Sequence, residues 1–256
     1  MKLIDWVAVL GALAWAPHLI ALVKAWLQKS EIRVILQKTA ELGFTTYGSI
    51  FNVRMAFAVE NKDIVISEIK IRMKHESGEE RILEWQGITQ HIGKMKMPDA
   101  SEMPYEKEHS VLAIKLNQKD IEERFVRFQE PSYLNNQREY VYKALKKMEY
   151  LKSENKYRGE DFLRELEMKE LYAFNKHAFS WKQGKYTVQI EVQSPEKFVL
   201  VGNRFEFQLT PVDIERLEKN KDQLEADYKR IVLNVPEKDS DVIWEWCNPM
   251  LIKLNN

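Results

Sequence analysis

The chain has 256 residues, which is long enough to bury one large hydrophobic core or two small ones. Its 39 Lys and Arg are balanced by 39 Asp and Glu, so no basic excess indicates a nucleic-acid partner, and we expect none. Cys247 is the single cysteine, which excludes an intrachain disulfide.

The first patterned segment is an apolar run from Trp6 to Val23, in which His18 is the only polar side chain. As a helix this run would rise about 27 Å, close to the ~30 Å hydrocarbon thickness of a bilayer. Tryptophan side chains at the ends of a membrane helix favour the level of the lipid headgroups, and a lysine near the end can extend its ammonium group to that level. A proline is tolerated within a membrane helix. The residues that define this predicted anchor are Trp6, Pro17, Lys24 and Trp26.

We therefore predict a single-pass transmembrane helix within residues 1–29, with the lipid bilayer as one partner. More Lys and Arg follow the run than precede it, so the positive-inside rule predicts an N-terminus outside and a cytoplasmic body. The reverse orientation would give a periplasmic body, as an exported cell-envelope domain. Two further alternatives are a signal peptide cleaved after Ala16 and a buried helix of a soluble core.

Residues 31–129 carry the alternation that is typical of strands. In Ser49–Val59, apolar side chains recur at every second position, and Asp63–Lys74 repeats this pattern. Gly78 then predicts the turn of a hairpin. We interpret residues 87–108 as a long loop because glycines, prolines and methionines interrupt the pattern.

Helical spacing follows. Asn117 to Asp120 is predicted to begin a helix, with Asn117 as its cap. From Asn136 to Phe174 apolar residues recur at helical spacing, with a break near Gly159. Thr210 to Asp213 has the cap, the first-position proline and the acidic third residue of another helix start.

Strand alternation returns after Trp181. The stretch with Trp181, Gly184, Tyr186 and Val188 resembles the W-x-x-G-x-Y-x-V segment of immunoglobulin-like domains. This resemblance implies an antiparallel sandwich in which Tyr186 and Val188 face the core. The predicted fold class is mainly β with α: a transmembrane helix, an immunoglobulin-like β-sandwich with a helical insertion, and a C-terminal helix. The predicted segments are 1–29 (anchor), 31–129 (first part of the sandwich), 134–176 (helical insertion), 177–210 (last strands) and 211–256 (C-terminal helix and tail).

The sequence shows no catalytic motif, and we predict no catalytic, metal or cofactor-binding residue and no cofactor. The five histidines lack the spacing of a zinc site, and His75 is interpreted as part of a solvated turn. Cys247 is interpreted as a packing residue. Trp244 and Trp246, which alternate with acidic residues, are possible contacts for a partner; the alternative is that their indoles pack on the body.

We therefore expect a membrane-anchored, non-enzymatic interaction or scaffold protein of bacterial type. Its body would bind a protein partner or a second copy of the chain. The alternative is an enzyme or enzyme subunit whose site forms between the sandwich and the helical insertion.

Overall fold

The computed structural model describes residues 15–20, 22–23, 29–96, 102–109, 113–118, 120–236 and 242–254, with the backbone alone for 88–96 and 102–109. Its strands are β1 Ser30–Leu36, β2 Glu41–Thr45, β3 Gly48–Glu60, β4 Ile64–Ile66, β5 Glu68–His75, β6 Glu80–Lys96, β7 Glu102–His109, β8 Ile114–Leu116, β9 Ile121–Gln129, β10 Gly184–Gln193, β11 Phe198–Val201, β12 Arg204–Leu209, β13 Trp246–Cys247 and β14 Ile252–Lys253. Its longer helices are α2 Pro131–Ser153, α4 Leu166–His177 and α5 Pro211–Val232, and α3 is the short turn Gly159–Phe162.

The predicted transmembrane helix is wrong for the residues that can be described. Across these parts of the chain, no helix combines the length and the apolar character that crossing a bilayer requires. Pro17 lies among the described residues 15–20, which are helical. Trp6, Lys24 and Trp26 lie outside the described residues.

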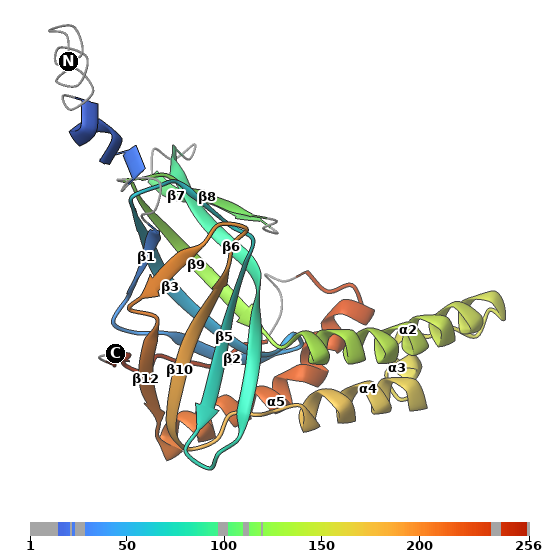
Figure 1. Cartoon of the computed structure of the whole chain (residues 1–256). Helices are drawn as coiled ribbons and strands as arrows, with labels where there is room; N and C mark the ends of the chain where they lie inside the picture. Colours follow the sequence, from blue (N-terminus) through green and yellow to red (C-terminus); the bar gives the residue numbers. More distant parts are fainter. Residues whose placement is uncertain are drawn as a thin grey trace, which may run out of the picture.

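Twelve strands form one large curled sheet rather than two stacked sheets (Figure 1). Along the main path the order is β11-β1-β3-β9-β6-β5-β10-β12-β14; β2 joins β3 and β13, and β7 joins β6. β4 and β8 pair separately. The prediction of an immunoglobulin-like sandwich is therefore wrong, and the fold is mixed α/β, with about 40% strand and 34% helix. Alternation could not separate the two folds, because a sandwich and a curled sheet each bury one face of every strand.

The two ends of the sheet meet beside Gly202. β11 and β12 are consecutive in the chain, yet β11 pairs in parallel with β1 whereas β12 pairs with β10. The C-terminal segment fills part of the seam between them, because β14 pairs with β12 and the Leu251 N–H donates to the Lys38 carbonyl at 2.7 Å. The curled sheet thus encloses the main core.

The core follows the alternation seen in the sequence. Along β3 the side chains with the parity of Phe51 are buried, as predicted. In β10, Tyr186 stacks on Phe207 of β12 with ring centroids 4.9 Å apart. The hairpin turn at Gly78 is also confirmed, since β5 pairs with β6. The predicted loop over 87–108 is wrong, because β6 continues to Lys96 and pairs with β7.

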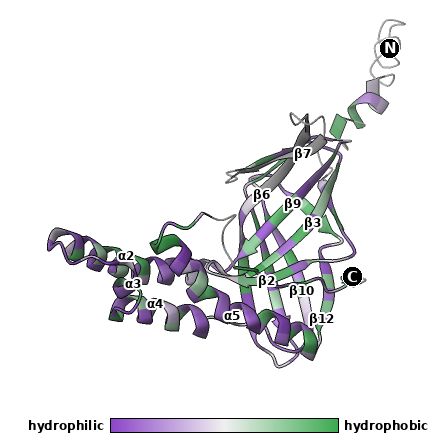
Figure 2. Cartoon of the chain, turned by 180° about the vertical axis from the view of Figure 1, so that it is seen from behind, coloured by the Kyte–Doolittle hydropathy of each residue, from purple (hydrophilic) through white to green (hydrophobic). Residues whose placement is uncertain are grey.

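The helices α2, α3 and α4 form an arm that extends to one side of the sheet (Figure 1). Hydrophilic residues dominate the colouring of α2 and α5 (Figure 2). The arm has a small core of its own around Phe162 and Leu171, whereas Leu217 and Leu224 of α5 pack into the main core. The predicted start of α5 is confirmed, because Thr210 and Asp213 form a reciprocal capping box. The predicted helix after Asn117 is wrong, because Ile121 opens strand β9.

Candidate functional site

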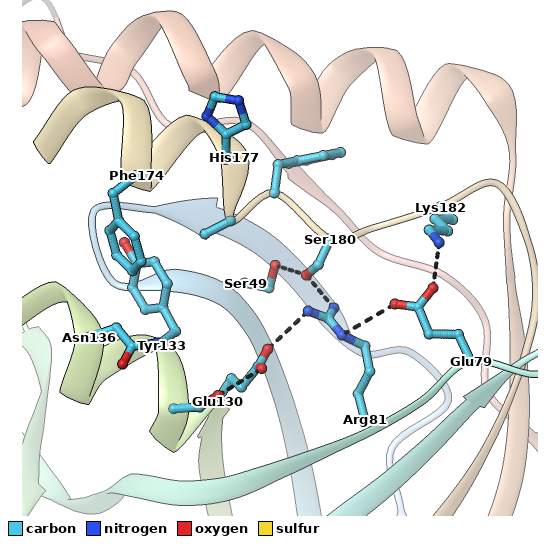
Figure 3. A pocket seen from close by; sticks show the side chains of 13 residues that line it. Ser49, Glu79, Arg81, Glu130, Tyr133, Asn136, Phe174, His177, Ser180 and Lys182 are labelled. Atoms are coloured by element: carbon cyan, nitrogen blue, oxygen red, sulfur yellow. Dashed lines mark hydrogen bonds and ion pairs between the residues drawn. The ribbon is translucent and has the colours of Figure 1, made fainter. Parts of the chain in front are cut away.

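A cavity of about 360 Å³ lies where the arm meets the sheet (Figure 3). Separate parts of the chain supply its walls: the start of β3, the start of β6, the first turns of α2, the end of α4, and the linker from α4 to β10. The lining residues used below are Ser49, Glu79, Arg81, Glu130, Tyr133, Asn136, Phe174, His177, Ser180 and Lys182.

Arg81 lies at the centre of the cavity, with a side chain that is only 14% exposed. Its Nη2 contacts a Glu130 carboxylate oxygen at 2.9 Å, and its Nε lies 4.0 Å from Glu79. Its Nη1 donates to the Ser180 hydroxyl. Arg81 therefore ties β6 to the start of α2 and to the linker after α4.

The edge of the cavity near Glu79 is also paired. Lys182 forms an ion pair with Glu79, and this hydrogen bond is the main cause that lowers the pKa of the Glu79 carboxyl. Glu79 is thus held as a carboxylate close to the Arg81 guanidinium. Two cations and two carboxylates line the cavity, so its formal charge is balanced.

The opposite wall is aromatic. Phe174 of α4 stacks with Tyr133 and with Tyr140, both from α2, at centroid separations of 5.4 and 4.6 Å. His177, one turn further along α4, donates from Nδ1 to the Ala173 carbonyl at 2.7 Å. A second open cavity of about 490 Å³ shares Phe174 and His177 and continues along the arm. The two cavities are therefore neighbours, with Phe174 and His177 in the walls of both.

A buried polar network behind the aromatic wall fixes the arm on the sheet. The Tyr133 hydroxyl lies 2.7 Å from Oδ1 of Asn175, a side chain that is 0% exposed, and 2.9 Å from the Thr46 carbonyl. Asn175 donates in turn to the Tyr228 hydroxyl of α5 at 2.9 Å. Burial raises the pKa of Tyr133 and of Tyr228. Both phenols therefore remain neutral near neutral pH.

The tryptophans singled out from the sequence lie apart from this cavity. Trp244 packs half-buried against the main core, and Trp246 belongs to β13 and covers Gly43 of β2. Both indoles thus contribute to packing on the body. Their contact with a partner stays a prediction.

The structure corrects the interpretation of His75 and agrees with that of Cys247. His75 is buried rather than solvated: its Nε2 donates to the Gln183 carbonyl at 3.0 Å, and its Nδ1 accepts from the Ser77 N–H at 3.2 Å. Cys247 is buried in the main core, where burial raises the pKa of its thiol to about 12. A packing role for Cys247 is therefore confirmed. In the described ranges, no cluster of three or more His, Cys, Asp or Glu could hold a metal ion.

Sequence reasoning missed the centre of the cavity. One signal was available, because Arg81 has the parity of Leu83 and Trp85 in β6 and so places a cation on the core-facing side of a strand. A charge in such a position needs partners. Ser49 and Ser180 carried no signal, since only the fold brings them together.

Comparison with protein-family models finds no match, and comparison with curated proteins finds no relative. The function must therefore be argued from the cavity itself.

Proposed function

We propose that the chain is a non-enzymatic interaction protein that binds a protein partner in the cavity between the curled sheet and the helical arm. The observation that carries this proposal is the arrangement around Arg81. A cavity of this size, about 360 Å³, lies in the range typical of binding sites. Its polar groups converge from distant parts of the chain, and ion pairs and stacked rings hold them in place.

The contacts of the hydroxyl groups favour binding over nucleophilic catalysis. A serine nucleophile needs a base within hydrogen-bond reach. Ser180 contacts Arg81 and Ser49, which are not bases, and the His177 Nδ1 donates to a backbone carbonyl. These contacts suit groups that hold a ligand rather than attack one.

A photo-crosslinking amino acid at Asn136 tests the proposal. Asn136 is exposed, lines the cavity and lies on α2, so that its replacement should leave the fold intact. Gln208, exposed on β12, is the matched control. In native cells we expect an adduct of discrete mass from position 136 and none from position 208. An adduct of twice the chain mass would identify a second copy as the partner. Absence of any adduct from several cavity positions would contradict the proposal.

The second candidate function is an enzyme or enzyme subunit. For this alternative a site is expected between the sheet and the helical insertion, and the cavity lies between the sheet and the helices. The observation that favours it is the presence of His177, Glu79 and Glu130 around one cavity. This candidate predicts turnover of a small molecule that is lost on His177→Ala. Retention of crosslinking by the same variant would favour the interaction protein.

A further inference from the structure

We infer that the cavity at Arg81 binds an uncharged, extended segment of a polypeptide, with a backbone carbonyl of that segment at the Arg81, Ser49 and Ser180 donors. This inference rests on the proposed function and names the chemistry of its ligand.

The serine pair supplies the first argument. The hydroxyl oxygens of Ser49 and Ser180 lie 2.6 Å apart, and Ser180 also accepts a hydrogen bond from Arg81. The two hydroxyls have two hydrogens, and one hydrogen serves the bond between them. Among the described contacts, the other hydrogen has no acceptor. Ser49 is 4% exposed and Ser180 is partly buried, so this hydrogen lies in a largely buried place on either hydroxyl, where an entering acceptor would be favoured.

Arg81 supplies the second argument. A guanidinium has five N–H donors, and the described hydrogen bonds of Arg81 go to Ser180 and Glu130. Donors are therefore available at the centre of the cavity. Glu130 and Glu79 flank the guanidinium, however, and would repel an anion that approached it. The site thus offers hydrogen-bond donors without a net positive charge.

An amide group matches this arrangement better than a carboxylate or a phosphate. Its carbonyl can accept from Arg81 and from the serine pair, while its N–H can donate to a flanking carboxylate. It carries no charge, so that it does not disturb the balance between the two cations and the two carboxylates. A polypeptide segment provides such amides in sequence.

The neighbouring cavity supplies the third argument. It shares Phe174 and His177 with the first cavity and is also lined by Tyr140 and Lys143 of α2. An extended segment could pass from one cavity to the other with one of its side chains against the stacked rings of Phe174 and Tyr140. Aromatic rings held in a column provide rigid contact area at low entropic cost.

Two neighbouring asparagines give a matched pair of variants. Asn135 and Asn136 are both exposed on α2, and Asn136 lines the cavity. Asn136→Trp should fill the cavity, whereas Asn135→Trp adds the same bulk one position away. Ser49→Ala removes one hydroxyl donor, and Ser67→Ala, whose hydroxyl bonds to the Gln193 carbonyl, is its control.

The first probe is a displayed library of random peptides of about twelve residues, from which binders are selected. The selected peptide is then synthesised with both termini blocked, and its affinity is measured. We expect selected peptides that are uncharged at their centre and whose affinity changes less than about threefold between about 0.05 and 0.5 M NaCl. Asn136→Trp should abolish binding, and Ser49→Ala should weaken it about fivefold, while both controls bind like the wild type.

Selection of acidic peptides with a strong salt dependence would overturn the inference in favour of an anion site. Binding that survives Asn136→Trp, or a library that selects no peptide, would overturn it as well. The crosslink from position 136 separates the two proposals. If that adduct forms while the library fails, the interaction stands and the ligand chemistry is wrong; if neither succeeds, both proposals fail.

Discussion

Asn220 of α5 pairs with the backbone of Glu245 through two hydrogen bonds. The Asn220 amide donates to the Glu245 carbonyl at 2.8 Å, and the Glu245 N–H donates to the Asn220 Oδ1 at 2.7 Å. Asn220 is 0% exposed. This side chain therefore acts like a neighbouring strand and holds the C-terminal segment in the register that places Trp244 and Trp246 on the body.

Replacing Asn220 by Ala should lower the free energy of unfolding by about 2–4 kcal/mol, because the N–H and the carbonyl of Glu245 both lose their partners in a partly buried contact. Chemical denaturation measures this change, and Asn135→Ala on the exposed face of α2 is the control, with an expected change within about 0.5 kcal/mol. An Asn220→Ala variant as stable as the wild type would show that the C-terminal segment does not depend on this pairing.

Gly43 is required by the close approach of Trp246. A Cβ at position 43 would lie 2.6 Å from Cε3 and 2.8 Å from Cη2 of that indole. Gly43→Ala should therefore cost about 1–3 kcal/mol of stability by overpacking. In a double-mutant cycle the cost of Gly43→Ala should shrink in a Trp246→Leu background, because the smaller side chain leaves room. Equal costs in both backgrounds would contradict this contact.

Gly202, in the turn between β11 and β12, and Gly78, in the hairpin turn between β5 and β6, form a natural comparison. Both have positive φ, 74° and 93°. A Cβ at Gly202 would lie 2.7 Å from the Val34 carbonyl oxygen, whereas a Cβ at Gly78 meets nothing within 4 Å. Gly78→Ala should cost about 1–2 kcal/mol from its dihedral angle alone. Gly202→Ala should cost about 1–3 kcal/mol more, because the added Cβ would collide with the Val34 carbonyl oxygen, a backbone atom that cannot move aside as a side chain can.

The Cys247 thiol should make stability fall at alkaline pH. Burial raises its pKa from the ordinary 9.0 to about 12, so between these values the folded chain holds a proton that the unfolded chain releases. The contribution of the protonated thiol to the free energy of unfolding is therefore fully present below pH 9.0 and is lost as the pH rises towards 12. At about pH 10.5 the loss should be about 2 kcal/mol. Buried tyrosines act in the same direction. Urea unfolding of Cys247→Ala at pH 8 and at about pH 10.5 isolates the thiol. An unchanged pH dependence in this variant would exclude its contribution.

The sequence by itself determined the local elements whose signals are short-range. The capping box at Thr210, the turn at Gly78 and the buried parity of Phe51 along β3 all depend on residues within a few positions of each other. Arg81 has the parity of the core-facing Leu83 in its strand, but the sequence interpretation did not use this signal. These features depend on local backbone geometry and on the burial of one face of a strand, and neighbouring residues in the sequence specify both.

The tertiary structure decided what those elements enclose. One curled sheet and two stacked sheets require the same alternation, so strand order had to come from pairings such as β11 with β1, which join residues far apart in the chain. The cavity depends on the same long-range pairing. Ser49 and Ser180 are 131 positions apart, and only the packing of the arm against the sheet sets their hydroxyls 2.6 Å from each other beside Arg81.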